Sequence, residues 1–365
     1  MEEALLGGLS PQVFLRRYWQ KRPLLVRRAL PGFRGVVGKS ALFSLAARDE
    51  VESRLVERRG KKWRVEHGPL PRRRLAQTGA RNWTLLVSGV NCYSEAAEAL
   101  LRRFAFIPQA RLDDVMVSYA APGGGVGPHV DSYDVFLVQG DGRRLWRIAR
   151  PRRFAMVPDV PLKQIAGFKA DEEVLLGPGD LLYLPPGWGH DGVALDACFT
   201  CSVGFRAPGG AELAAAFLDY LHERGLPDAG YRDPGLRATR HPAQIGGEMT
   251  AFAEKLLARI SWRKSDVREF MGRYLSTPKP NVVFKRNTKK QALSGEVALL
   301  DPKTRLLYSG SRFFINGESF VPRASQRAVL RELANRRQAP GSRLARAGLV
   351  ALISDWQHAG YLTVT

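Results

Sequence analysis

The sequence predicts an α+β protein in which a β-barrel is followed by a helical segment and a small mixed C-terminal domain. Short apolar runs separated by Gly- and Pro-rich turns fill the first two hundred or so residues, as is typical of strands. The apolar period then becomes helical, because Leu213, Phe217 and Leu221 are each four residues apart. Thr277–Pro280 is a stiff linker to further short strands and helices. We therefore expect three parts, residues 1–208, 209–276 and 277–365.

Composition favours a protein with sizeable hydrophobic cores, since 45% of its 365 residues are hydrophobic. No uninterrupted apolar run approaches the roughly 18 residues of a membrane helix. The start, Met1-Glu2-Glu3, lacks the basic residues of a secretory signal, and three cysteines are too few for a disulfide framework. We expect a cytoplasmic protein with no membrane contact.

The most informative motif is His129-Val130-Asp131. A β-rich run, Val115–Tyr119, precedes it, and the Gly-rich loop Pro122–Pro128 leads into it. The pair is expected to open the next strand, which continues through Tyr133 to Gln139. Alternation along that strand would place five side chains on one face: His129, Asp131, Tyr133, Val135 and Leu137. Alone, such a pair is more often a surface turn than a ligand pair.

A third ligand candidate, His190, follows the turn and short apolar strand of Gly177–Pro186. The 59 residues between Asp131 and His190 leave room for about four strands. Two imidazoles and one carboxylate occupy one face of an octahedral ion and leave the other open, as in non-haem Fe(II) oxygenases. The alternative for His190 is a buried structural histidine. The whole pattern predicts an iron-dependent oxygenase.

Arg144 is the candidate anchor for a co-substrate. Gly140–Gly142 resembles a hairpin turn and Arg143–Arg150 its returning strand, on which Arg144 shares a face with Trp146 and Ile148. An arginine on an apolar face needs an anionic partner, and its planar guanidinium suits a carboxylate. That partner is either an acidic residue of the protein or, beside an iron site, the far carboxylate of 2-oxoglutarate.

Several blocks together resemble the Jumonji C ribosomal oxygenases, and within them the bacterial branch that hydroxylates an arginine of a large-subunit ribosomal protein. The resemblance extends over nearly the whole chain. The blocks are Phe14–Leu24, Gly68-Pro69, Trp83–Val87, Pro122–His129, Tyr133–Phe136, Gly142–Arg144, Pro185–Gly187 and Ser202–Pro208. Two positions depart from the family pattern: Leu145 stands where another arginine is expected, and Trp188-Gly189 precedes the last ligand in place of more usual residues.

The resemblance implies a double-stranded β-helix (cupin) barrel that binds Fe(II) through His129, Asp131 and His190, with 2-oxoglutarate and O2 as co-substrates. It implies that Arg144 anchors 2-oxoglutarate and that Ser118 assists. Tyr133 either lines the substrate pocket or packs in the barrel. The helical segment would form a homodimer interface, and residues 277–365 a winged-helix-like domain.

The formal charge of +21 suggests an anionic partner such as a ribosome or nucleic acid. From Pro278 to Thr365, 15 lysines and arginines face 5 acidic residues, most densely at Lys285–Lys290. Transient contact with rRNA and a merely solvated loop both fit this cluster. The basic residues of the winged-helix segment also leave DNA binding open: Arg327, Arg331, Arg336 and Arg337.

We therefore expect a 2-oxoglutarate- and Fe(II)-dependent hydroxylase that modifies an arginine of a large-subunit ribosomal protein. Two alternatives share the fold, a ribosomal histidine hydroxylase and a lysine demethylase. A third belongs to another class, a non-catalytic metal-binding regulator that binds DNA through its C-terminal domain.

Overall fold

The computed structural model of the chain describes residues 5–158, 160–287, 293 and 296–365. Contacts divide the chain into two compact units. The first combines Met1–Ala207, Pro278–Thr304 and Ala328–Thr365, and the second combines Pro208–Thr277 with Arg305–Arg327. Part of the basic cluster at Lys285–Lys290, namely residues 288–290, lies outside the described residues. The three-part division at residues 208 and 276 stays a prediction.

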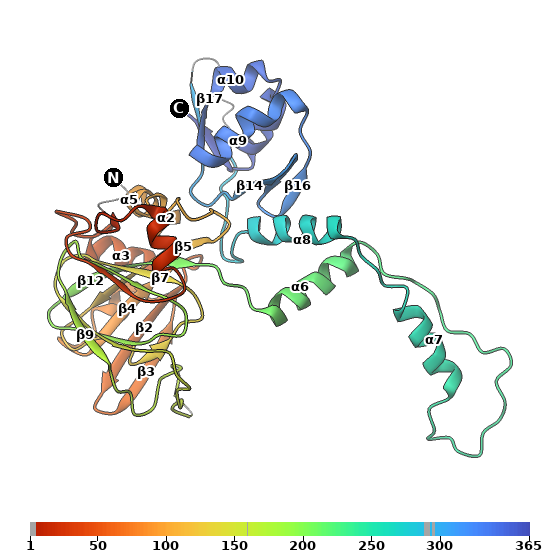
Figure 1. Cartoon of the computed structure of the whole chain (residues 1–365), viewed down its shortest axis with the longest axis horizontal. Coiled ribbons are helices and arrows are strands. Elements are labelled where there is room, and N and C mark those ends of the chain that lie inside the picture. Colours follow the sequence, from red (N-terminus) through yellow and green to blue (C-terminus); the bar gives the residue numbers. More distant parts are fainter. Residues whose placement is uncertain (1–4, 159, 288–292, 294–295) are drawn as a thin grey trace. The chain divides into compact units, whose positions relative to one another are not determined.

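The first unit is built on two antiparallel sheets (Figure 1). The larger has eight strands, in spatial order β1 (Leu24–Val26), β10 (Leu181–Leu184), β7 (Val135–Gln139), β12 (Cys198–Phe205), β5 (Leu112–Ala120), β4 (Trp83–Val87), β2 (Ser53–Arg59) and β3 (Lys62–His67). The smaller has four, in the order β6 (His129–Val130), β11 (Gly189–Ala194), β8 (Arg144–Ala149) and β9 (Glu172–Leu176). This confirms the predicted series of short strands.

Apolar side chains on both faces of the large sheet account for the layers. One face packs against the N-terminal helices, in a core that includes Phe14, Leu42 and Leu100. Those helices are α2 (Pro11–Arg17), α3 (Lys39–Ala46), α4 (Arg72–Leu75) and α5 (Glu95–Arg102), with the short 3-10 turn η1 (Val90–Cys92). The opposite face meets the small sheet, where Leu137 and Leu182 pack with Trp146 and Ile148. The two sheets therefore enclose the predicted barrel.

Two expectations about the strands are wrong. Residues 129–139 do not form one strand, because β6 lies in the small sheet and β7 in the large one. Gly140–Gly142 is not a hairpin either, since β8 pairs with β11 and β9 rather than with β7. Alternation holds only within one strand, and the chain passes from the small sheet to the large one between residues 130 and 135. β6 has only two residues, too few for its apolar pattern to mark the crossing.

A buried polar cluster joins the N-terminal region to the barrel. The hydroxyl of Tyr183, which is fully buried, donates to Asp134 Oδ1 at 2.6 Å and accepts from the Gln20 amide at 2.8 Å. Gln20 Nε2 also donates to Asp134 Oδ2, at 3.0 Å. Burial, followed by the hydrogen bond to Asp134, raises the pKa of Tyr183 above its usual range, so this side chain stays a neutral donor.

Tyr183→Phe is expected to lower the free energy of unfolding by about 1–3 kcal/mol, because the Gln20 amide and the Asp134 carboxylate each lose a buried partner. Urea unfolding followed by circular dichroism measures this change. Tyr231→Phe, in the irregular stretch after α6, serves as the control. Equal shifts in the two variants would show that the cluster contributes nothing specific.

The second unit confirms the helical segment, with α6 (Gly210–Glu223), α7 (Gly247–Leu257) and α8 (Lys264–Ser276). Residues 226–246 between the first two are irregular, as the Gly- and Pro-rich sequence from Gly225 to Gly247 predicts. Ser265-Asp266 resembles an N-terminal cap that would precede α8, but the helix already begins at Lys264. Asp266 caps it from within, accepting from the Arg263 amide at 2.7 Å. A meander completes this unit: β14 (Leu306–Ser309), β15 (Arg312–Ile315) and β16 (Glu318–Phe320), then the 3-10 turn η2 (Ala324–Gln326).

The remaining C-terminal elements belong to the first unit, apart from the first residue of α9. They are β13 (Val297–Leu300), α9 (Arg327–Arg336), β17 (Gln338–Pro340), α10 (Gly341–Arg346), α11 (Val350–His358) and β18 (Leu362–Val364). The sequence predicts a strand near Val282–Phe284, but residues 282–287 are irregular. It also predicts one helix over Leu344–Ala359, which the structure breaks at residues 347–349, where Gly348 takes a positive φ of 70°.

Arg337 does not belong to a free basic helix face. Its guanidinium pairs with Glu98 of α5 at 3.0 Å and donates to the carbonyls of Thr304 and Asp301, at 2.9 and 2.7 Å. The expectation that Arg337 is available for DNA is therefore wrong. Among the described helices, none is both long and apolar enough to cross a bilayer.

Candidate metal and co-substrate site

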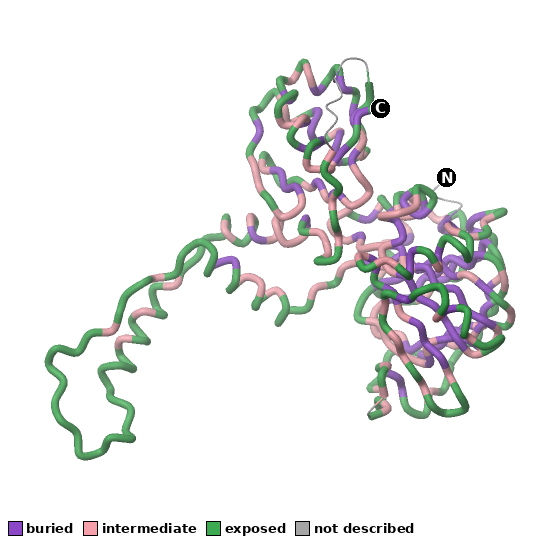
Figure 2. Tube along the Cα trace, turned by 180° about the vertical axis from the view of Figure 1, so that it is seen from behind, coloured by how far each residue is buried: buried purple, intermediate pink, exposed green. Residues whose placement is uncertain are grey.

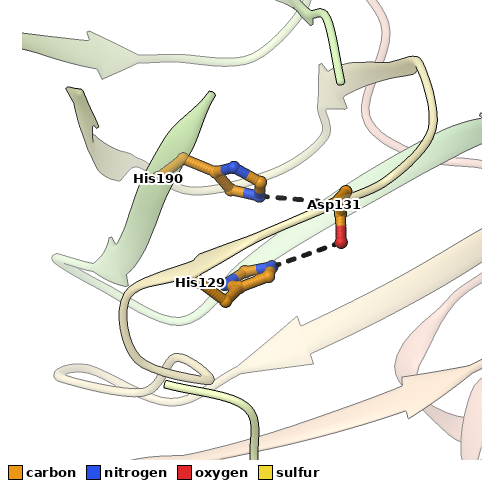
Figure 3. Close-up of side chains that lie close together, drawn as sticks. All are labelled: His129, Asp131 and His190. Atoms are coloured by element: carbon orange, nitrogen blue, oxygen red, sulfur yellow. Dashed lines mark ion pairs between the residues drawn. The ribbon is translucent and has the colours of Figure 1, made fainter. Parts of the chain in front are cut away.

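The three side chains predicted as metal ligands meet at one end of the small sheet (Figure 3). His129 of β6 and His190 of β11 are direct cross-strand partners, and their ring centroids are 4.2 Å apart. Asp131 lies just beyond β6, with its oxygens 3.9 Å from His129 Nε2 and 3.5 Å from His190 Nε2. One donor atom from each residue lies within 4.8 Å of the other two.

Hydrogen bonds fix how the two imidazoles face the centre. His129 Nδ1 lies 2.9 Å from the Gly127 carbonyl oxygen, and His190 Nδ1 lies 3.0 Å from that of Trp188. A carbonyl only accepts, so in each neutral ring Nδ1 carries the proton and Nε2 keeps its lone pair. Burial, and then the neighbouring His129, lower the pKa of His190 to about 4. His190 is therefore neutral near pH 7, as a metal ligand must be.

Asp131 is positioned differently from the histidines. It lies where the chain passes from the small sheet to the large one, between β6 and β7. The Gly187 amide donates to the Asp131 carbonyl at 2.9 Å, so the predicted Pro-Pro-Gly turn holds this backbone in place. Two nitrogens and one carboxylate oxygen on one side of a centre form a donor set that suits Fe(II).

Arg144 lies inside the barrel, as predicted, and only 5% of it is exposed. Its Nη1 donates to Ser118 Oγ at 3.3 Å, across from β8 to β5. Its Nε and Nη2 are buried and have no hydrogen-bond partner within the described part of the chain. A buried guanidinium without an anion is costly, so this arrangement fits a carboxylate from outside the chain.

The position of Arg144 along the sheet matches a long dianionic co-substrate. It is paired with Ala194, four residues beyond His190 on β11. At about 3.3 Å per residue, roughly 13 Å of strand separates the two backbones, a gap that an arginine side chain and a five-carbon diacid can together bridge. Leu145, the first departure from the family pattern, lies on the other face of β8 and leaves Arg144 in place.

Tyr133 lies beside the candidate ligands and is 39% exposed. Burial, and then the charges of Asp131 and Asp114, raise the pKa of its hydroxyl above the usual range. Asp114 shares a face of β5 with Ser118, because the two are four residues apart on one strand. Asp114 and its neighbour Asp113 form an acidic pair on this strand, and Arg206 Nε lies 3.4 Å from Asp113.

A second cation that pairs with Asp113 and Asp114 was not predicted from the sequence. Lys279, in the predicted linker, places its Nζ 3.0 Å from carboxylate oxygens of both Asp113 and Asp114. The segment after β8, which packs against the ligand-bearing loops, was also not predicted. Ile165 donates its amide to the Pro128 carbonyl at 2.7 Å, and any side chain at Gly189 would collide with Phe154 at 2.8 Å. These contacts join residues distant in sequence, and no local pattern marks them.

The spacing of Cys198-x-x-Cys201 resembles a redox or zinc motif, but with no second cysteine pair core packing is the expected role. Both thiols are fully buried on β12, in separate clusters, and burial raises the pKa of Cys201 to about 12. Cys201 is therefore not a thiolate at neutral pH, which argues against a reactive redox pair.

Comparison with known proteins places this geometry in a family. Residues 99–213 match the JmjC domain family, and residues 232–363 match the ROXA-like winged helix family. Over 360 residues the chain is 36% identical to the Escherichia coli ribosomal protein uL16 3-hydroxylase, covering 95% of this chain and 96% of that protein. The chain belongs to the Jumonji C ribosomal oxygenases. The predicted cupin fold with a C-terminal winged-helix domain is thereby confirmed.

Other ribosomal oxygenases extend the similarity. A probable ribosomal oxygenase of Haemophilus influenzae is 39% identical over 205 residues, which cover 55% of this chain and 50% of that protein. Among solved structures, the Escherichia coli ribosomal oxygenase YcfD in complex with cobalt and 2-oxoglutarate superposes with a TM-score of 0.80 at 34% identity, covering 98% of each chain. The same protein has been solved with cobalt and succinic acid, with a TM-score of 0.79.

Proposed function

We propose that this ribosomal oxygenase is an Fe(II)- and 2-oxoglutarate-dependent hydroxylase that oxidises an arginine side chain of a large-subunit ribosomal protein. The observation that carries the proposal is Arg144, a buried guanidinium with two free donor nitrogens in the same barrel as the three candidate ligands. The uL16 hydroxylase and the solved complex with 2-oxoglutarate support it. A ribosomal substrate also favours the cytoplasm as the place of action.

Each residue has a defined task in this proposal. His129, Asp131 and His190 hold Fe(II) through Nε2, a carboxylate oxygen and Nε2, while Arg144 and Ser118 bind the far carboxylate of 2-oxoglutarate. When bound, iron, 2-oxoglutarate and O2 supply the oxidising power, so that a substrate C–H becomes C–OH while succinate and CO2 are released. The chain itself orients the reactants and provides no general base for this step. Tyr133, partly exposed beside Asp131, lines the substrate pocket.

The choice of arginine comes from the resemblance to the bacterial branch of the family. The charge of the site does not decide it, because Asp113 and Asp114 are paired within the chain, with Lys279 at 3.0 Å from both and Arg206 at 3.4 Å from Asp113. The mass of the product therefore has to distinguish arginine from histidine.

The test incubates iron-loaded protein with 2-oxoglutarate, oxygen and purified large-subunit ribosomal proteins. Mass spectrometry then measures the intact mass of each ribosomal protein, and fragmentation locates the modified residue. A gain of one oxygen on an arginine of one protein, absent when 2-oxoglutarate is omitted, is the expected result. The same gain on a histidine, or loss of a methyl group from lysine, would replace the arginine assignment with one of the two related activities. Absence of succinate from iron-loaded protein would reject the enzyme.

We also propose that the predicted helical segment, residues 209–276, forms a homodimer interface. Figure 2 shows that most of the backbone from residue 225 to residue 260 is exposed. Phe252 and Leu256, four residues apart, give α7 an apolar stripe. No side chain of α7 is buried, and within the described part of its own unit the ring of Phe252 meets only that of Tyr231, at 5.4 Å between centroids. Eight large apolar side chains of the segment are exposed: Leu218, Leu226, Leu236, Ile245, Met249, Leu257, Trp262 and Val267. A surface this apolar is typical of an interface.

The double variant Leu257→Glu and Trp262→Glu is expected to lower the mass in solution from that of a dimer, twice 40.5 kDa, to that of a monomer, 40.5 kDa. The two side chains are 63% and 54% exposed, and charges there would be buried in the proposed interface. Size-exclusion chromatography with light scattering measures the mass. Val350→Glu, at an equally exposed apolar residue of α11, is the matched control and should leave the mass unchanged. Monomeric wild-type protein at micromolar concentration would contradict the proposal.

A further inference from the structure

The hairpin of β2 and β3, together with α4 and the residues that lead to β4, is rich in positive charge. Residues 54–81 contain ten lysines and arginines against two glutamates. We define the basic hairpin surface as the exposed cations of this stretch: Arg59, Lys61, Lys62, Arg64, Arg72, Arg73 and Arg81. Figure 1 shows β2 and β3 at the edge of the large sheet, next to β4.

Contacts within the first unit gather these cations into one surface. Arg74 of α4 bonds both Glu57 of β2, at 2.6 Å, and Glu66 of β3, at 2.7 Å, which fixes α4 against the hairpin. On the other side, the Arg58 amide donates to the Asn82 carbonyl at 2.8 Å, which places Arg81 beside β2.

The positive charge of this surface is largely uncompensated. The only two acidic residues of the stretch, Glu57 and Glu66, are already held by Arg74. Arg64 lies 3.6 Å from Glu66 and is the one cation of the surface with a carboxylate in reach, as far as the described residues extend. Arg72 donates to the Ser40 and Ser44 hydroxyls, which leave its charge unneutralised. The surface therefore attracts an anion from outside the chain.

The basic hairpin surface borders the loop that leads to His129. The Asn82 amide donates to the Pro122 carbonyl at 2.9 Å, at the start of that loop. At its end, a Cβ on Gly127 would lie 3.3 Å from the ring of Trp63 of β3. Trp63 pairs with Arg58 and lies on the opposite face of the hairpin from Arg59, Lys62 and Arg64, so one layer of sheet separates these cations from the end of the loop.

We propose that the basic hairpin surface binds the phosphate backbone of RNA next to the ribosomal protein being hydroxylated. This inference rests on the proposed function. Closely spaced lysines and arginines neutralise successive phosphates, and five of the seven cations are arginines, whose planar guanidinium suits phosphate oxygens.

Charge favours RNA over the substrate protein as the occupant. Proteins that bind ribosomal RNA are mostly basic, so a free ribosomal protein is repelled by this surface. Its RNA partner is attracted. The hairpin should therefore matter for a ribosomal protein bound to RNA and not for the same protein in isolation.

The experiment compares two charge-reversal triples in the full-length, iron-loaded protein. The first is Arg59→Glu, Lys61→Glu and Lys62→Glu at the tip of the hairpin. The matched control is Arg323→Glu, Arg336→Glu and Arg346→Glu in the C-terminal region. Binding to purified large-subunit rRNA is measured at several salt concentrations, with polyglutamate as a second probe. Hydroxylation is measured on the isolated ribosomal protein and on its complex with rRNA.

The hairpin triple is expected to weaken rRNA binding roughly tenfold or more and to flatten its salt dependence, by about 0.7 in log–log slope for each phosphate that the variant no longer neutralises. Hydroxylation of the RNA-bound substrate should fall while that of the isolated protein stays unchanged.

Two results would overturn the proposal in favour of general charge attraction. One is that both triples weaken rRNA binding equally, and the other is that the hairpin triple weakens polyglutamate binding as much as rRNA binding. Weakening by the control alone would assign RNA to the C-terminal region. Loss of activity on the isolated protein would assign the hairpin to the protein substrate. If wild-type protein hydroxylates nothing, the proposed function fails, while the binding arm still tests the hairpin.

Discussion

Asp131→Ala is expected to abolish hydroxylation and succinate formation, because it removes the carboxylate that completes the set made by the cross-strand pair His129 and His190. Affinity for Fe(II) should fall by more than the roughly 10–100-fold that follows the loss of a group that only orients a ligand. Anaerobic titration with Fe(II) measures the affinity, and succinate release measures turnover.

Asp141→Ala provides the control for this change. Asp141 is an exposed carboxylate that pairs with Arg34 at 2.9 Å, away from the candidate ligands in sequence and on the surface. Its loss should leave iron affinity and turnover at the wild-type level. Retention of iron and of succinate formation in Asp131→Ala would remove Asp131 from the ligand set.

Arg144→Met is expected to weaken 2-oxoglutarate binding by roughly a hundredfold or more. Methionine keeps much of the side-chain length but removes two charge-assisted hydrogen bonds, each worth about 1.5–3 kcal/mol, and 1.4 kcal/mol is a factor of ten. Titration of 2-oxoglutarate into the Mn(II)-loaded protein reports binding without turnover. Ser118→Ala should have a smaller effect in the same direction, because Ser118 contributes one neutral hydroxyl at 3.3 Å from Arg144.

Arg143→Met tests whether the loss of any nearby positive charge is enough to weaken 2-oxoglutarate binding. Arg143 precedes Arg144 in the chain, but its guanidinium is exposed and pairs with Asp196 at 2.8 Å. It should leave 2-oxoglutarate affinity unchanged. If Arg144→Met bound 2-oxoglutarate as tightly as wild type, another cation would have to hold the far carboxylate.

The parts of this site that could be predicted are those carried by short segments. His129 and Asp131 are two residues apart, and the two Gly- and Pro-rich turns that precede His190 are visible in the sequence. Arg144 was placed on the inner face by alternation along a single strand, β8, and the structure has it there. Within one strand the period of two is reliable, since each side chain points opposite to its neighbours.

The errors arose where structure depends on pairing between distant strands. Residues 129–143 do not indicate that the chain changes sheets twice, because β6 is only two residues long and the pairing of β7 and β8 is with strands far along the chain. Lys279 and Asp114 are 165 residues apart, and their ion pair exists only once the linker lies against β5. The basic hairpin surface is similar. Its cations are obvious in the sequence, but their place beside the His129 loop depends on the order β5, β4, β2 and β3.

The position of Asp131 has a consequence for how long the protein survives. Its two histidine partners belong to the small sheet, whereas Asp131 lies on the strand connection that continues into the large sheet. An ion held by all three would tie the sheets together, so metal occupancy and global unfolding are thermodynamically linked. At a free metal concentration a hundred times the dissociation constant, such linkage adds about 2.7 kcal/mol to the folded state. Cellular iron supply would then govern the lifetime of the polypeptide as well as its rate of turnover, and iron-starved cells would degrade it faster.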